Sequence, residues 1–206
     1  GKRFSSKKPK QYYLYKNKEI FEHSLEKALN SKLFKKIILV IDNKKKLKKK
    51  YSKNIQVITG GKERSDSSLL ALKIIKKYKP TSVFIHDAAR PNFSIKLLNI
   101  MIKNLRRYKA VVPIIKSKDS VKYSIKKQIF NLDRNNVLLT QTPQAFRFKD
   151  LYKLAIKQKN KINDEATLFI NANYKIKFIQ GENQNIKITY LGDINTPKTF
   201  FGIGFD

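Results

Sequence analysis

The sequence of 206 residues contains no cysteine. It can therefore form no disulfide, no thiolate metal site and no cysteine nucleophile, which fits a reducing cytoplasm, where we expect the protein to act. No apolar run approaches the roughly 20 residues that a membrane-spanning helix needs. Residues 1–5 also lack the apolar core of a secretion signal. We therefore expect no membrane partner.

Acidic residues are scarce, with 15 Asp and Glu against 46 Lys and Arg and a formal net charge of +31. Such a charge can favour nucleic acid, because clustered cations release counterions from a phosphate backbone. Only seven of the basic residues are arginine, the better reader of bases and phosphates, and the lysines are spread along the whole chain. The lysine runs at 44–46 and 48–50 are typical of a solvated surface. We expect no nucleic-acid partner, and a basic nucleic-acid-binding module is the non-enzymatic alternative.

Short apolar runs rich in β-branched residues alternate with longer segments of helical period. This pattern is typical of a doubly wound α/β domain with a mostly parallel sheet, and the length suits one such domain. The expected strands are 37–41, 55–58, 82–85, 110–113 and 176–179. The expected helices are 19–29, 67–78, 95–108 and 150–158, with Ser65 or Asp66 capping the second of these and Ser94 the third.

Between residues 119 and 142 the pattern changes. Alternation at 121–125, a polar turn at 126–128 and the apolar pair Ile129-Phe130 predict a β-hairpin. By this pattern it is either an arm that projects toward a partner or an edge hairpin of the same sheet. A mononucleotide-binding α/β domain normally opens with a buried strand that feeds a glycine-rich loop. This sequence starts inside what looks like such a loop, so we expect the first strand to be missing.

Two segments offer places for an anion. Residues 1–11 form a loop with basic side chains before the first expected helix, which is suited to neutralising a triphosphate. Residues 60–68 place two glycines after a strand and before a helix, where the backbone can approach an anion closely. By itself, the second segment is equally well read as an ordinary strand-to-helix turn.

A third segment, residues 86–91, follows an expected strand at its carboxyl end, where open α/β sheets bind ligands. There Asp87 could bind a ribose hydroxyl or a metal, and Arg90 could hold a phosphate or position Asp87. His86 is either a packed, hydrogen-bonded residue or an acid or base. A fourth, dispersed group of polar motifs lies at 133–135, 140–144, 164–166 and 185–189.

In this order and spacing the motifs resemble those of the 2-C-methyl-D-erythritol 4-phosphate cytidylyltransferases of isoprenoid biosynthesis. The resemblance runs from residue 1 to about residue 189. It rests on KPKQ (8–11), GG.ER..S (60–67), HDAARP (86–91), DRN (133–135), QTPQ.F (141–146), DEA (164–166) and NIKIT (185–189). It implies a Rossmann-like nucleotidyltransferase that uses CTP with Mg²⁺ or another divalent cation and releases pyrophosphate. An acceptor such as ribitol 5-phosphate is the enzymatic alternative.

The resemblance also implies roles for single residues. Arg3 and Lys10 match the family's transition-state stabilisers. Arg134 and Lys187 match the residues that place the sugar phosphate for attack. In this family the hairpin swaps across a homodimer, so Ser120 and Arg134 would serve the neighbouring subunit. The other matched positions surround the nucleotide, its ribose and the second substrate, and are Gly61, Lys62, Ser67, Asp87, Arg90, Thr142 and Thr189.

After residue 195 the sequence departs from the family's pattern. Residues 196–206 resemble a linker followed by the opening strand of a 2-C-methyl-D-erythritol 2,4-cyclodiphosphate synthase, in which Asp206 would match the first metal ligand. We therefore expect an N-terminally truncated cytidylyltransferase domain at 1–195, in front of a fused synthase domain.

Overall fold

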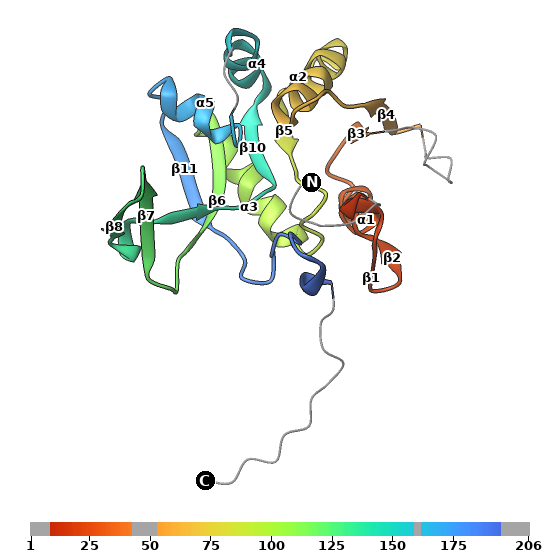
Figure 1. Ribbon diagram of the computed structural model, residues 1–206. Coiled ribbons are helices and arrows are strands. Elements are labelled where there is room, and N and C mark those ends of the chain that lie inside the picture. Colours follow the sequence, from red (N-terminus) through yellow and green to blue (C-terminus); the bar gives the residue numbers. More distant parts are fainter. Residues whose placement is uncertain (1–8, 43–52, 159–161, 195–206) are drawn as a thin grey trace.

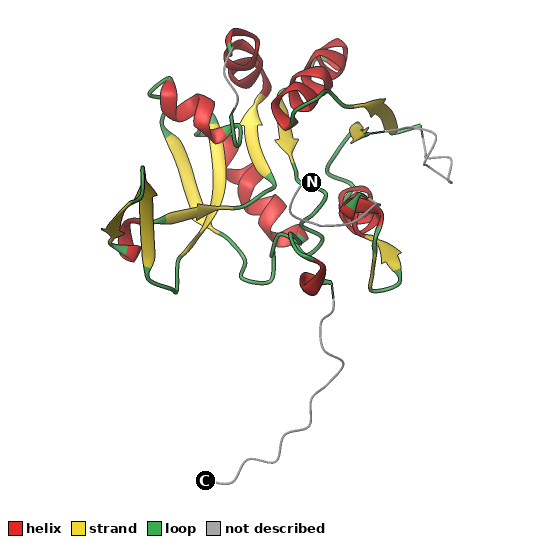
Figure 2. Ribbon diagram, in the orientation of Figure 1, coloured by secondary structure: helices red, strands yellow, loops and turns green. Residues whose placement is uncertain are grey.

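Helices cover both faces of a central β-sheet (Figures 1 and 2). The computed structural model describes residues 9–42, 53–158 and 162–194 of the chain. Its central sheet has five strands and is mixed, because β10 is antiparallel to both of its neighbours whereas β6 and β11 are parallel. In sheet order, the strands are β11 (Ile176–Gln180), β6 (Ala110–Lys116), β10 (Gln144–Arg147) and β5 (Ser82–Ile85), with β9 (Leu138–Thr140) paired to β6.

The helices and short elements complete the α/β class that the sequence pattern predicted. In chain order they are η1 (Lys10–Tyr12), β1 (Leu14–Tyr15), β2 (Lys18–Glu19), α1 (Ile20–Asn30), α2 (Arg64–Ile75), η3 (Lys76–Tyr78), α3 (Ile95–Leu105), η4 (Arg134–Asn136), α4 (Phe148–Lys157), α5 (Ala166–Asn171) and η5 (Leu191–Asp193). None of the described helices is long and apolar enough to cross a lipid bilayer.

Two hydrophobic cores lie on opposite faces of the central sheet. Successive side chains of a strand point to opposite faces, so Ala110 and Phe146 enter one core while Val111 and Ala145 enter the other. The helix residues that cover them are Leu72, Leu151, Leu168 and Phe169 on the first face, and Leu97, Leu98, Met101 and Leu105 on the second. This double cover is what the doubly wound class requires, and that expectation is confirmed.

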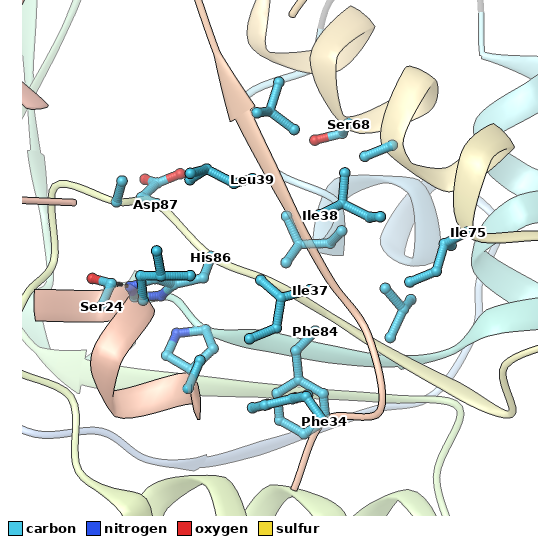
Figure 3. Close-up of a pocket in the computed structure, with 18 of the residues that line it drawn as sticks. Ser24, Phe34, Ile37, Ile38, Leu39, Ser68, Ile75, Phe84, His86 and Asp87 are labelled. Atoms are coloured by element: carbon cyan, nitrogen blue, oxygen red, sulfur yellow. Dashed lines mark hydrogen bonds between the residues drawn. The ribbon is translucent and has the colours of Figure 1, made fainter. Parts of the chain in front are cut away.

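A gap divides the sheet where the first strand was expected. β3 (Ile37–Ile41) and β4 (Ile55–Thr59) form a separate parallel pair. In the described ranges, β3 pairs only with β4 and β5 only with β10, so each has one edge without a strand partner. A cavity of about 390 Å³ lies between them, and its lining runs from Phe34 at one end to Asp87 at the other (Figure 3). Apolar side chains of both strands therefore line a cavity that no strand of the described ranges fills.

The predicted hairpin is an arm that projects away from the central sheet (Figure 1). β7 (Val121–Ile125) and β8 (Gln128–Leu132) pair only with each other in the part of the chain that the structure describes. Lys126 and Lys127 form the tight turn, with φ of 45° and 71°. The hairpin arm, residues 121–132, carries large exposed apolar side chains at Tyr123, Ile125, Ile129, Phe130 and Leu132.

One expected helix cap is right and another is wrong. Ser94 caps α3, because its hydroxyl accepts a hydrogen bond from the backbone N–H of Leu97 at 3.0 Å. Neither Ser65 nor Asp66 caps α2. Its cap is Glu63, and Asp66 instead accepts from the Glu63 backbone N–H as the second half of a capping box. The helix therefore starts at Arg64, three residues earlier than expected.

We predict that Phe146→Ala strongly destabilises the fold. Phe146 is fully buried on β10 and stacks on Phe169 with ring centroids 5.1 Å apart. Truncation would leave a cavity at the middle of the sheet and lower the free energy of unfolding by about 3–5 kcal/mol. Chemical denaturation measures this loss. Ile156→Ala on α4 is the matched control, because Ile156 is 50% exposed, and it should change the same quantity by less than about 0.5 kcal/mol.

Candidate active site

Asp87 is the central residue of the candidate site. It follows β5, and its backbone N–H donates to Thr142 Oγ1 at 3.0 Å. Its carboxylate accepts from two cations, Arg64 through Nε at 3.2 Å and Lys187 through Nζ at 2.6 Å. Burial by itself raises the pKa of Asp87, but the two cations outweigh burial and hold the pKa well below its usual range. Asp87 is therefore a fixed anion between two fixed cations.

Arg64 joins Asp87 to a second carboxylate. Its Nη1 and Nη2 donate to the two oxygens of Glu165 at 3.0 and 2.8 Å, which is the forked geometry that guanidinium and carboxylate prefer. Glu165 is only 1% exposed. Burial lowers the pKa of Arg64, but the charges of Glu165 and Asp87 more than reverse that effect and leave the pKa above its ordinary value. Arg64 therefore stays charged between its two carboxylate partners.

Lys10 is bonded to the segment that carries Lys187. The ammonium of Lys10, in η1, donates to the backbone carbonyl of Ile188 at 2.9 Å. The backbone N–H of Ile188 in turn donates to Ala89 O at 2.8 Å, which holds this segment against the loop after β5. Thr189 supports Lys187, because its hydroxyl donates to Lys187 O at 2.9 Å. Two of the expected cations are therefore brought together, while Arg3 lies outside the described residues.

Arg90 has a positioning role in this structure. Its Nη1 donates to Asn185 O at 2.8 Å and its Nη2 to Thr140 O at 3.3 Å. The Arg90 backbone N–H also donates to Asp87 O at 2.9 Å. The side chain of Arg90 therefore joins the loops at residues 140 and 185, and the printed hydrogen bond to Asp87 comes from its backbone.

Buried amides complete the frame around Asp87. Asn185 Nδ2 donates to Thr142 O at 2.9 Å, and Gln141 Nε2 donates to Glu182 O at 2.8 Å. Gln144 Nε2 donates to Asp164, whose other oxygen accepts from the backbone N–H of Thr167. Thr142 is thus a support for Asp87, with its hydroxyl taken up inside the protein.

His86 is a packed residue in this structure. Its Nε2 lies 3.1 Å from both Ser24 Oγ and Arg90 O, and its ring packs edge-on against Phe93 with centroids 4.6 Å apart. Burial lowers the pKa of His86 to about 4, so the ring is neutral at pH 7. Figure 3 places it beside Ser24, along the wall of the cavity. The packed interpretation, not the acid or base, is favoured.

The glycine loop folds back onto the start of α2. The Gly61 N–H donates to Ser67 Oγ at 3.1 Å, and the Gly60 N–H donates to Ile41 O at 2.8 Å. A Cβ on Gly61 would lie 2.4 Å from the Cβ of Asp66, closer than real side chains approach. Glycine is therefore needed for close packing here. Lys62, the residue after Gly61, is exposed.

Arg134 and Ser120 lie at the base of the hairpin arm. Arg134 Nη1 donates to Lys118 O at 3.1 Å. Arg134 and Ser120 are both exposed. Within the described ranges, no hydrogen bond joins either of them to Asp87 or Lys187. The fold of one chain therefore does not gather these two residues with the rest of the candidate site.

A resident metal ion has little support from the donor atoms. Among the described residues, no group of three or more His, Asp or Glu side chains could hold one. The carboxylate of Asp87 contacts Lys187 through its Oδ2. Mg²⁺ is often bound by one or two carboxylates together with substrate phosphates. Asp87 could supply one such carboxylate, and Asp206 lies outside the described residues.

The most important residues without an expected role are Arg64 and Glu165. Both stand inside motifs that the sequence singled out, ER at 63–64 and DEA at 164–166. The two residues are 101 positions apart, and their ion pair could not be read from either motif alone. Arg64 is an arginine inside a motif, in a chain whose cations are mostly lysine. That contrast is the signal that could have pointed to the ion pair.

The chain matches the family model described as 2-C-methyl-D-erythritol 4-phosphate cytidylyltransferase (IspD) over residues 1–201. It is 47% identical over 209 residues to the bifunctional enzyme IspD/IspF of Pelagibacter ubique, covering all of this chain and 56% of that protein. It is 36% identical to the 2-C-methyl-D-erythritol 4-phosphate cytidylyltransferase of Thermosipho melanesiensis, covering 94% of this chain and 90% of that one.

Two solved structures share the fold. The 4-diphosphocytidyl-2C-methyl-D-erythritol synthase of Anaerococcus prevotii superposes with a TM-score of 0.80 at 33% identity, covering 89% of each chain. The bifunctional IspDF of Campylobacter jejuni superposes with a TM-score of 0.82 at 29% identity, covering 95% of this chain and 50% of that one. The chain thus spans about half the length of the bifunctional proteins that it matches.

We predict that His86 makes the fold sensitive to acid. Its pKa is about 4 in the folded chain and 6.5 ordinarily, so the unfolded chain binds a proton first as the pH falls. The stabilising effect of the neutral ring is complete above about pH 6.5 and is lost toward pH 4, by roughly 3 kcal/mol in total. Denaturant unfolding at a series of pH values between 7 and 4 measures this loss.

The matched comparison for this prediction uses the two histidines of the chain. His86→Gln should lose stability less steeply between pH 7 and 4 than the wild type, because it has no imidazole to protonate. His23→Gln, on α1, should keep the wild-type slope. Equal slopes for wild type and His86→Gln would show that protonation of His86 does not govern the acid limb.

Proposed function

Because this chain belongs to the 2-C-methyl-D-erythritol 4-phosphate cytidylyltransferase family, we propose that it transfers CMP from CTP to 2-C-methyl-D-erythritol 4-phosphate. The products are 4-diphosphocytidyl-2-C-methyl-D-erythritol and pyrophosphate. The reaction belongs to the biosynthesis of isoprenoid precursors, and we place it in the cytoplasm. The observation that carries the proposal is the convergence of Lys10, Lys187 and Arg64 around the loop of Asp87, at the carboxyl end of β5.

The reaction is a single displacement at phosphorus. A phosphate oxygen of the sugar phosphate forms a bond to the α-phosphorus of CTP. The bond from that phosphorus to the oxygen that bridges to the β-phosphorus breaks, and pyrophosphate leaves with the electron pair. Negative charge spreads over the oxygens of the transferred group, so permanent cations nearby lower the barrier.

The side chains of this site divide the work. Lys10 faces the charge that develops on the transferred phosphoryl group, with Arg3 as its expected partner. Lys187 holds the phosphate of the acceptor in line for attack, and Arg134 of a neighbouring subunit holds it from the other side. Holding both reactants in one geometry supplies much of the rate enhancement in reactions of this kind. Gly61, Lys62 and Ser67 are proposed to belong to the segment that lines the cytidine pocket. The segments around the ribose and the second substrate are proposed to be those of Asp87, Arg90, Thr142 and Thr189.

A divalent cation, most simply Mg²⁺, accompanies CTP in this proposal. When bound, it neutralises phosphate charge and orients the triphosphate. Asp87 is the protein residue that would contact it, and the other ligands would come from the phosphates and water. The residues of the cleft then bind, orient and exclude water around the two substrates.

The hairpin arm is proposed to reach across a homodimer. Its exposed apolar residues include Ile129, which is 72% exposed, and an isolated two-stranded hairpin is only marginally stable in water. A second copy of the chain would cover these side chains and bring Arg134 and Ser120 to the partner's cleft. The 47% identity to a bifunctional protein supports the proposal of a cytidylyltransferase domain at 1–195, followed at 196–206 by a linker and the start of a synthase domain.

We predict that the reaction depends on Lys10 and Lys187. Pyrophosphate release from CTP should require methylerythritol phosphate and Mg²⁺ in the complete gene product that carries this sequence. Lys10→Ala and Lys187→Ala should each lower kcat/KM by about a hundredfold to a thousandfold, the usual cost of losing one charge-stabilising donor. Lys103→Ala, at an exposed position on α3, is the matched control and should keep wild-type activity. Unchanged rates in both variants would contradict the assignment of chemistry to this cleft.

We also predict that two inactive variants restore each other. If Arg134 serves the partner's site, a dimer of one Lys187→Ala chain and one Arg134→Ala chain contains one intact site and one doubly altered site. Random mixing gives such dimers half of the time, so the mixture should regain about a quarter of wild-type activity by this symmetry argument. No recovery after mixing and refolding, with dimers shown by sedimentation, would mean that Arg134 acts within its own chain.

A further inference from the structure

The buried carboxylate of Glu165 requires compensation, and Arg64 provides it. A carboxylate that is almost fully buried is costly unless it is both paired and hydrogen-bonded. Glu165 meets both conditions with one partner, through the two parallel hydrogen bonds from Nη1 and Nη2 of Arg64. These two bonds fix the plane of the guanidinium. The direction of the Nε–H donor is then fixed as well.

The fixed guanidinium in turn determines which oxygen of Asp87 is free for Lys187. Nε of Arg64 donates to Oδ1 of Asp87, and Nζ of Lys187 donates to Oδ2 at 2.6 Å. The four residues come from four segments of the chain: Arg64 begins α2, Glu165 precedes α5, Asp87 follows β5 and Lys187 follows β11. The chain of contacts therefore runs from a buried carboxylate to the ammonium in the cleft.

We infer that Arg64 and Glu165 are a positioning pair for Lys187, which act through Asp87 and do not touch a substrate. Without the charge of Glu165, Arg64 is released to turn its fork onto Asp87, because two parallel bonds to one carboxylate are the favoured arrangement. That fork would occupy Oδ2 and displace Lys187. Arg64 and Glu165 carry opposite charges, so the pair adds no net charge to the cleft, and its effect on Lys187 is orientation.

This inference rests on the proposed function, since Lys187 is proposed to hold the phosphate of the acceptor. It predicts a selective loss. Glu165→Gln, which keeps the size of the side chain, should raise KM for methylerythritol phosphate or lower kcat by about tenfold to a hundredfold, the usual range for a misplaced reactant. KM for CTP should change less than KM for methylerythritol phosphate, because Arg64 stays bonded to Asp87 while Lys187 loses its partner.

A second variant and a control separate positioning from general stability. Arg64→Lys keeps the charge beside Glu165 but cannot make the fork and the Asp87 contact together, so it should show the same selective loss. Asp150→Asn is the matched control, because Asp150 also forms an ion pair between two elements, with Lys109 at 3.0 Å. It should leave both KM values and kcat within about twofold of wild type.

The deciding experiment is a double-mutant cycle on kcat/KM with Lys187→Ala, in the complete gene product. If Arg64 and Glu165 act only through Lys187, then Glu165→Gln or Arg64→Lys should cost less than about twofold further in the Lys187→Ala background. Losses that multiply in full would overturn the inference and mark the pair as structural. An inactive wild type would instead contradict the proposed function itself, and this inference with it.

Discussion

A carboxylate held between two cations is the constraint on which the rest of the site depends. Asp87 is half-buried at the end of a strand, with a side chain that is 17% exposed, and an unpaired negative charge there would be destabilising. Arg64 and Lys187 compensate it, and Glu165 compensates Arg64. The result is two positive and two negative charges in contact. The two shielded carboxylates are acceptable only because these cations are in place, so the four segments that supply the charges must meet in one arrangement.

The loops around these charges are held by hydrogen bonds to backbone. Asn185, Gln141 and Arg90 donate to carbonyl groups of neighbouring loops, and the Asp87 N–H is taken by Thr142. Such bonds satisfy backbone groups that would otherwise be buried without a partner. They also leave the loops little freedom before any substrate arrives. A site whose dipoles and charges are already oriented needs less reorganisation during the reaction.

The antiparallel strand β10 explains how one domain can carry both the cleft and the arm. The chain leaves β6, forms the hairpin arm and returns through β9 to enter the sheet as β10, between β6 and β5. Thr142, which holds Asp87, comes just before β10. The base of the arm, where Arg134 lies, is therefore connected to the cleft through only a few residues. This connection makes an arm that serves a neighbouring subunit compatible with a rigid cleft in its own chain.

Local sequence patterns were sufficient for the elements whose signal is local. The strands at 37–41 and 82–85 and the hairpin were predicted because alternation and apolar runs depend on nearby residues. β10 and α5 were missed, because four residues after a proline and a helix of six residues carry too little periodicity. The capping of α2 by Glu63 was missed because Ser and Asp are the commoner caps.

The sequence by itself determined the α/β class, the hairpin and the motifs that contribute to the site, since each is encoded in residues close together along the chain. Only the tertiary structure decided that Arg90 binds carbonyl groups, that His86 is packed, and that Arg64 joins Glu165 to Asp87. Arg64 contacts residues that are 23 and 101 positions away in the sequence, and Arg90 contacts one that is 95 positions away. Their partners are chosen by how the sheet brings its loops together, and the strength of a charge depends on the burial that this packing creates.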